Sequence, residues 1–155
     1  MGARRRFLLH MDSQRKTPIQ VAREAQFVDN MAAFMRRDFK TVEAAWRPDV
    51  VMDMPGTSWL AGVHRGFDDV SRCVLGLRHV LASDNRRTTF LHEGDQMIVR
   101  HDIEVHGPDH VVEMTLRVRV RYDSQGKAAS ISLEPDDLGL FDHVLNTVLR
   151  NSQAS

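Results

Sequence analysis

The sequence contains a single cysteine, Cys73, so no disulfide can form within the chain. It also lacks a net charge, because 21 lysines and arginines balance 21 aspartates and glutamates. This balance does not favour nucleic acid or an anionic membrane as a partner, and no apolar run is long enough to span a bilayer. We therefore expect a protein of a reducing, cytoplasmic compartment that binds neither nucleic acid nor membrane.

The first residues are basic and then briefly apolar, with arginines at 4–6 and an apolar run at 7–9. The apolar run ends at His10, far short of the hydrophobic region of a secretory signal. We expect residues 1–16 to be a flexible basic leader, residues 17–150 to form one domain, and residues 151–155 to be a flexible tail.

Helix signals are present at several points of the chain. Thr17 to Gln20 form a capping box with proline at the first helical position. The predicted helix carries one apolar stripe at 4-3-4-3 spacing, made of Val21, Ala25, Val28, Ala32 and Met35. A short helix over 39–46 must end before Pro48. Further helices are predicted from Gly66 and, at the end of the domain, from Leu138.

Strand-like segments fill the remaining sequence. They are predicted over 49–54 and 59–65, and as four runs beyond Asn85 that are separated by turn-forming residues. Helices and antiparallel strands are thus segregated along the chain, which is typical of the α+β class.

Turn lengths predict which strand residues face one another. A three-residue turn would pair His106 with His110, and the last turn would pair Tyr122 with Ala128. The even-numbered residues of the strand 110–122 are apolar, so they predict the face that lines the interior.

With that register, Arg100, Leu116 and Glu134 form one row across three strands, and Asp102 lies one step along. An apolar sheet would then carry one cation and two carboxylates, which are costly to bury unless they are paired. Carboxylates beside one arginine separate in pKa, which suits acid–base chemistry. The alternative is a solvated salt bridge on a sheet turned the other way.

The order of elements and the helix opening Gly66-Phe67-Asp68-Asp69-Val70 resemble the nuclear-transport-factor-like superfamily and its SnoaL-like branch. The resemblance covers about residues 18–150. It implies a curved antiparallel sheet that forms a cone with N-terminal helices and a C-terminal helix around an apolar pocket. It also implies a homodimer.

The site is most similar to that of limonene epoxide hydrolase, which carries Arg-x-Asp on a central strand, as Arg100 and Asp102 do here. A second acidic residue, Glu134, precedes an Asp-Leu pair as in that family. The resemblance implies that Glu134 is the base that activates water, that Asp102 is the acid that protonates the epoxide oxygen, and that Arg100 bridges both.

The first strand of that family carries Tyr-x-Asn-Met-Pro, where this sequence has Val51 and Asp53 in place of the tyrosine and the asparagine. By resemblance, Asp53 would help to position the water. The residues expected to contact the substrate are Val51, Trp59, His64, Met114, Leu116 and Val118. The histidines of the meander lack the spacing of a zinc site, so no metal is expected. The sequence has no glycine-rich phosphate loop, so no nucleotide or flavin cofactor is expected.

These observations predict a cofactor-independent acid–base enzyme for a small apolar substrate of the terpenoid or polyketide type, with epoxide hydrolysis or opening as the reaction. One alternative is a polyketide cyclase or a ketosteroid-isomerase-like enzyme with Asp53 or His64 as the base. Another is a non-catalytic module that binds small molecules.

Overall fold

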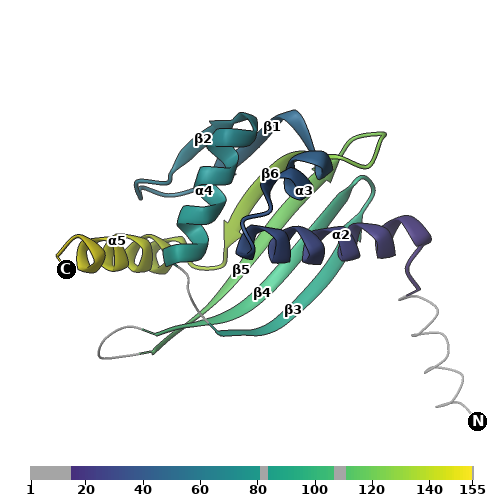
Figure 1. Ribbon diagram of the computed structural model, residues 1–155. Helices are drawn as coiled ribbons and strands as arrows, with labels where there is room; N and C mark the ends of the chain where they lie inside the picture. The colour runs from purple at the N-terminus through teal and green to yellow at the C-terminus, as the bar shows by residue number, and fades with distance from the viewer. Residues whose placement is uncertain (1–14, 81–83, 107–110, 155) are drawn as a thin grey trace, which may run out of the picture.

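The computed structural model describes residues 15–80, 84–106 and 111–154. Within them the helices are α2 (Pro18–Met35), α3 (Phe39–Ala45), α4 (Gly66–Val80) and α5 (Leu138–Ala154). The strands are β1 (Trp46–Met54), β2 (Gly62–Arg65), β3 (Asp84–Glu93), β4 (Gln96–His106), β5 (Val111–Tyr122) and β6 (Ala128–Pro135). The predicted α+β class is confirmed (Figure 1).

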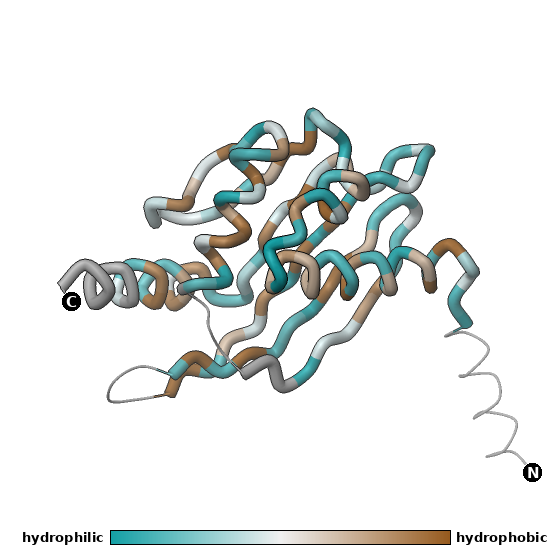
Figure 2. The backbone as a smooth tube through the Cα atoms, in the orientation of Figure 1, coloured by the Kyte–Doolittle hydropathy of each residue, from teal (hydrophilic) through white to brown (hydrophobic). Residues whose placement is uncertain are grey.

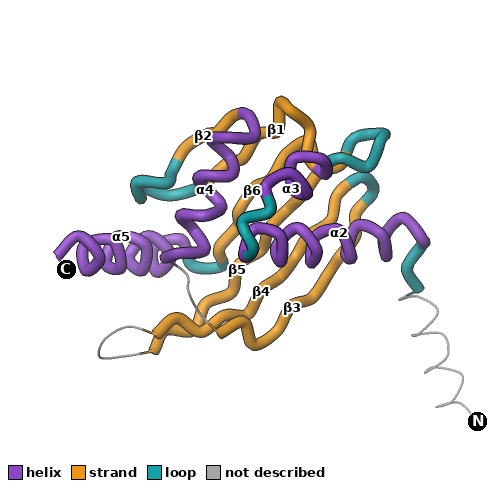
Figure 3. Tube along the Cα trace, in the orientation of Figure 1, coloured by secondary structure: helices purple, strands orange, loops and turns teal. Residues whose placement is uncertain are grey.

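The described strands form one curved sheet in the order β2-β1-β6-β5-β4-β3. All neighbouring pairs are antiparallel except β1 and β6, which run parallel. Helices α2, α3 and α4 cross one face of this sheet, and α5 extends away from its end (Figure 3). Hydrophobic and hydrophilic segments alternate along the strands, as expected for a sheet with one face covered and one face open (Figure 2).

Helix α2 begins where the sequence predicts it. The Thr17 hydroxyl accepts a hydrogen bond from the Gln20 backbone N–H at 3.2 Å, and the Gln20 side chain accepts one from the Thr17 N–H at 3.0 Å. The capping box is therefore complete, and two N–H groups at the helix start are satisfied.

The face that α2 buries differs from the predicted one. The 4-3-4-3 stripe is not buried: Val21, Val28 and Met35 are exposed by 53%, 55% and 68%, and Val28 and Met35 border the cavity described below. The helix instead turns Phe27 and Phe34 toward the sheet, where Phe34 is 2% exposed. The two phenylalanines bury more apolar area than the valines and alanines of the stripe, so they determine the orientation.

Helix α3 ends at Ala45, and β1 begins at Trp46, before Pro48 rather than after it. The pairing of β1 with β6 shifts between Trp46 and Val51, so the proline lies in an irregular part of the ladder. A proline has no N–H to donate, and such a position tolerates it.

The pairing of β4 with β5 differs from the prediction by one residue. His106 pairs with Val111, not with His110, and the residues between this pair lie outside the described part. Because side chains alternate faces, this shift moves the even-numbered side chains of β4 to the other face. Arg100 therefore lies opposite Arg117.

A second shift occurs between β5 and β6. The predicted pair of Tyr122 and Ala128 is confirmed, but a bulge follows it and adds one residue to β6. Glu134 therefore pairs with Arg117 instead of Leu116. The bulge turns Glu134 to the outer face, the same face that Arg100 reaches through the first shift.

The end of the chain is more helical than predicted, because α5 continues to Ala154 through most of the expected tail. Most of the predicted leader, residues 1–14, lies outside the described part. None of the helices described has the length and hydropathy needed to cross a bilayer.

Candidate functional site

A cavity of about 990 Å³ lies between the inner face of the sheet and the helices α2 and α4. Strands β4, β5 and β6 contribute an apolar floor, made of Ile103, Leu116, Val118, Val120, Ile131 and Leu133. Helix α2 supplies Phe27, Met31 and Phe34 from above, and Trp46 closes one side. The cavity is large enough for a small organic molecule and is lined mostly by apolar groups.

No aspartate or glutamate is among the described residues that line this cavity. The titratable side chains there are two histidines, two arginines and one tyrosine: His79, His101, Arg37, Arg78 and Tyr122. Acid–base chemistry in this cavity therefore depends on imidazole or phenol groups.

His101 lies on the inner face of β4, in the floor of the cavity and half-buried. Thr88, its partner across the β3–β4 pair, places its hydroxyl 3.2 Å from His101 Nδ1. The ring of Phe27 lies with its centroid 6.1 Å from that of the imidazole. A hydroxyl on one side and an aromatic ring on the other hold the imidazole in place.

Burial lowers the pKa of His101 below its usual value, and the positive charge of Arg78 lowers it further. The negative charge of Asp102 acts in the opposite direction and does not overcome these two effects. His101 is therefore neutral at physiological pH, which is the form that can accept a proton.

Two further polar groups face the cavity. Asn30 of α2 is only 7% exposed. Tyr122 of β5 is 5% exposed, and burial raises the pKa of its phenol to about 12. The guanidinium of Arg23 lies 4.8 Å from the centre of the Tyr122 ring, outside the residues that line the cavity.

The predicted trio lies on the opposite face of the sheet. Arg100, Arg117 and Glu134 form one row across three strands, so the predicted row exists with Arg117 in place of Leu116. The expectation that Arg100, Asp102 and Glu134 line the cavity is wrong, because the two one-residue shifts turn all three side chains outward.

The outer face satisfies these charges locally. Arg100 Nε lies 3.3 Å from Asp102 Oδ1, and the Thr115 hydroxyl donates to the same oxygen at 2.9 Å. Glu134 accepts from Arg119 Nε at 2.9 Å rather than from Arg100.

The hydrogen bond from Thr115 lowers the pKa of Asp102, and the hydrogen bond and charge of Arg100 lower it further. A carboxyl with a lowered pKa is ionised at neutral pH, so Asp102 is poorly suited to protonate an epoxide.

The other predicted residues of the first two strands lie outside the cavity wall. Asp53 and Val51 lie on the outer face of β1, where Asp53 is exposed. Trp59 is 58% exposed before β2 and packs close to Gly76 of α4, where a Cβ would lie 3.2 Å from its ring. His64 Nε2 lies 2.6 Å from the backbone oxygen of Leu60 and is occupied there.

Leu116 and Val118, predicted to contact the substrate, do line the cavity. Met114 lies on the same face of β5 and is buried in the core, but it does not belong to the cavity wall.

His101 was missed as a site residue, although the sequence contains a signal for it. It stands at an odd position of β4 among Met97, Val99 and Ile103, so a polar ring interrupts an apolar face.

Among the described residues, no cluster of three or more His, Cys, Asp or Glu side chains is arranged to hold a metal ion.

The fold is similar to those of solved structures described as NTF2-like or as having a cystatin-like fold. An NTF2-like protein from Burkholderia xenovorans is 22% identical, with 79% of this chain and 95% of that chain covered and a TM-score of 0.66. TerC co-crystallised with polyporic acid is 20% identical, with 80% and 98% covered and a TM-score of 0.61. A steroid delta-isomerase from Pseudomonas aeruginosa is 17% identical, with 90% and 100% covered and a TM-score of 0.59. No protein-family model and no curated protein sequence matches the chain.

Proposed function

We propose that this protein is a cofactor-independent enzyme that binds a small, largely apolar molecule in the cavity and moves a proton on it, with His101 as the base. The observation that carries this proposal is the position of a neutral imidazole in an apolar floor without any described carboxylate. A neutral imidazole has a free ring nitrogen that can accept a proton, so it can act as a general base.

The reaction type that fits best is isomerisation or cyclisation next to a carbonyl group. One base can remove a proton at one carbon and return it at another, so a second carboxylate is not needed. Epoxide opening by an acid and a base fits less well, because both predicted carboxylates face outward. The steroid delta-isomerase with this fold supports the choice of ketones as probes.

The test compares His101→Gln with a matched change, His143→Gln, at an exposed histidine of α5. Glutamine keeps hydrogen-bonding groups near Thr88 but cannot act as a base at neutral pH. The parent and both variants are incubated with a panel of β,γ-unsaturated ketones and epoxides, and deuterium uptake from D₂O reports proton abstraction.

We expect the parent and His143→Gln to exchange or isomerise a ketone, and His101→Gln to be slower by about 10²–10⁴-fold. Equal rates for His101→Gln and the parent would show that His101 is not the base. Tight binding in the cavity without exchange on any member of the panel would instead identify a non-catalytic binding module.

A further inference from the structure

The cavity has a charge of one sign, in contrast to the chain as a whole. The full sequence has equal numbers of acidic and basic residues. The described residues that line the cavity nevertheless include Arg37 and Arg78, and no aspartate or glutamate. Positive potential in a cavity with apolar walls is focused, because little solvent screens it.

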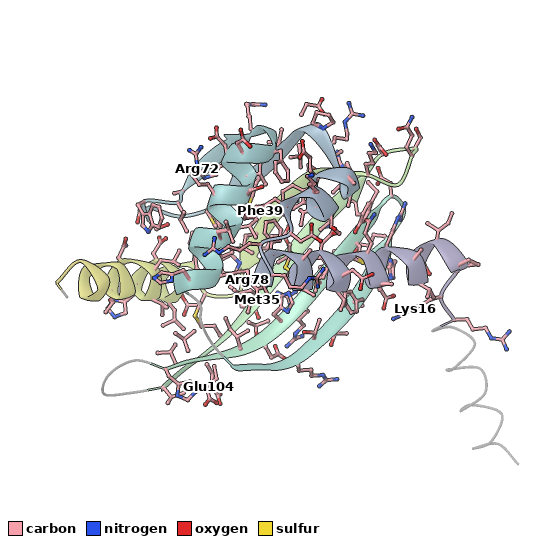
Figure 4. All side chains as sticks on the ribbon, viewed as in Figure 1. Lys16, Met35, Phe39, Arg72, Arg78 and Glu104 are labelled. Atoms are coloured by element: carbon pink, nitrogen blue, oxygen red, sulfur yellow. The ribbon has the colours of Figure 1, made fainter. Side chains whose placement is uncertain are left out.

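Arg78 is the group that brings this charge to the cavity. It extends from the last turn of α4 toward α2, where Nη1 lies 3.6 Å from the sulfur of Met31 and Nη2 lies 2.6 Å from that of Met35 (Figure 4). A thioether sulfur is a weak acceptor and carries no charge. Among the described residues, no carboxylate lies within ion-pair distance of Arg78.

Three arginines of the outer sheet face are different. Arg100, Arg117 and Arg119 each reach a carboxylate. A basic residue near a helix C-terminus is stabilised by the helix dipole. That stabilisation does not require the side chain to reach the cavity, so it does not explain why Arg78 lines it. Among the described residues, the guanidinium of Arg78 therefore has five N–H donors and two thioether sulfurs as its hydrogen-bond acceptors.

Asn30 provides a second unmet group. The residue is 7% exposed and lines the cavity, and its side chain makes no hydrogen bond with any other described residue. An amide that lines a cavity without a protein partner is available to donate to, or accept from, a polar group of a ligand.

We propose that the cavity is selective for an apolar molecule that carries one anionic group, such as a carboxylate, which binds the Arg78 guanidinium while Asn30 provides a further hydrogen bond. This inference rests on the proposed function in one respect, namely that the cavity is the binding site. It adds the chemical class of the substrate: an apolar carbonyl compound that also carries an anionic group, rather than a neutral one.

The test measures binding rather than turnover, with two probes of the same shape. 2-Naphthoate and 2-naphthamide share the aromatic body and differ in charge. Their affinities for the full chain are measured by titration calorimetry, and quenching of the fluorescence of Trp46, which lines the cavity, reports its occupancy. Hydrogen bonds to charged groups are stronger than neutral ones, so we expect the parent to prefer naphthoate by about tenfold or more.

Three variants assign that preference. Arg78→Met should reduce it to within about twofold while naphthamide binding stays unchanged, and Arg78→Lys should retain part of it because the charge remains. Arg72→Met is the matched control on the same helix, since the Arg72 side chain is 79% exposed, pairs with Asp69 and does not line this cavity (Figure 4). It should keep the full preference.

Equal affinity of the parent for the two probes, or a preference that survives in Arg78→Met, overturns the anion site. Failure of both probes to bind the parent overturns the cavity as the binding site as well. If His101→Gln exchanges the ketone as fast as the parent while the parent still prefers naphthoate, the catalytic proposal alone is overturned. The two proposals therefore fail in different experiments.

Discussion

Replacing Asp102 with Asn and Glu134 with Gln should leave the cavity and its chemistry unchanged. Both side chains lie on the outer face of the sheet, across the backbone from the cavity floor. The resemblance to limonene epoxide hydrolase implies that they are the acid and the base. These two substitutions therefore separate the predicted register from the observed one.

The loss of turnover expected for these two substitutions differs widely between the predicted and the observed register. If the two carboxylates were the acid and the base, loss of either would lower kcat by about 10²–10⁴-fold. On the outer face, the Asp102 and Glu134 side chains are 33% and 44% exposed. Water can replace their arginine partners, so turnover should change by less than about twofold, and Glu134→Gln should lower the free energy of unfolding by less than about 1 kcal/mol.

The neighbouring residue Leu133 gives the matched contrast on the inner face. It is 4% exposed and lines the cavity, one position before Glu134. Leu133→Ala should lower the free energy of unfolding by about 2–5 kcal/mol and enlarge the cavity. Two neighbouring positions of β6 should therefore differ in how strongly substitution lowers the free energy of unfolding: strongly at Leu133 and weakly at Glu134.

The assay combines urea unfolding with naphthoate binding and ketone exchange for all three variants. A hundredfold loss of exchange in Asp102→Asn or Glu134→Gln, with stability retained, would contradict the observed register. An effect of Leu133→Ala no larger than that of Glu134→Gln on stability and on binding would contradict it as well.

Three further predictions concern the cavity and the helix above it. Arg78→Met should raise the pKa of His101, because a neighbouring positive charge is removed, and the pH titration of the His101 ring by NMR checks this; an unchanged or lower value would mean that Arg78 does not act on His101. The free energy of unfolding of Tyr122→Phe should lose a pH dependence that the parent shows. Burial raises the Tyr122 pKa from 10.0 to about 12. The stabilisation that this gives is complete below pH 10 and is lost as the pH rises toward 12. Urea unfolding at pH 9 and pH 11 measures the free energy of unfolding at each pH. The same change in this free energy between the two pH values for parent and variant would contradict the prediction. Thr17→Ala should lower the free energy of unfolding by about 1 kcal/mol, because the capping bond to Gln20 is lost, whereas a change below a few tenths would mean that the cap contributes little.

The helix boundaries and much of the topology could be read from the sequence. The capping box predicted the first residue of α2, and turn residues predicted the last hairpin, where Tyr122 pairs with Ala128. The apolar even positions of β5 predicted its inner face, and Leu116 and Val118 do line the cavity. These features depend on interactions between residues close in the chain, which composition and spacing encode directly.

The buried face of α2 was beyond the same reasoning. The sequence predicts that its 4-3-4-3 stripe is buried, but Phe27 and Phe34 pack against the core instead. Which of two apolar faces a helix buries depends on the shape of the surface that it meets, and that surface comes from distant parts of the chain.

The homodimer and the cytoplasmic location expected from the sequence stay predictions.

The composition of the site was decided by the tertiary structure. By itself, the sequence determined an α+β domain with an apolar sheet face and placed Arg100 and Glu134 in one row across the strands. One extra residue before Val111 and one in the bulge after Ala128 turned that row outward and left His101 at the cavity, where the packing of α4 adds Arg78. Side chains alternate with a period of two, so a difference of one residue in a turn or bulge, too small to change any strand prediction, decides which side chains meet the ligand.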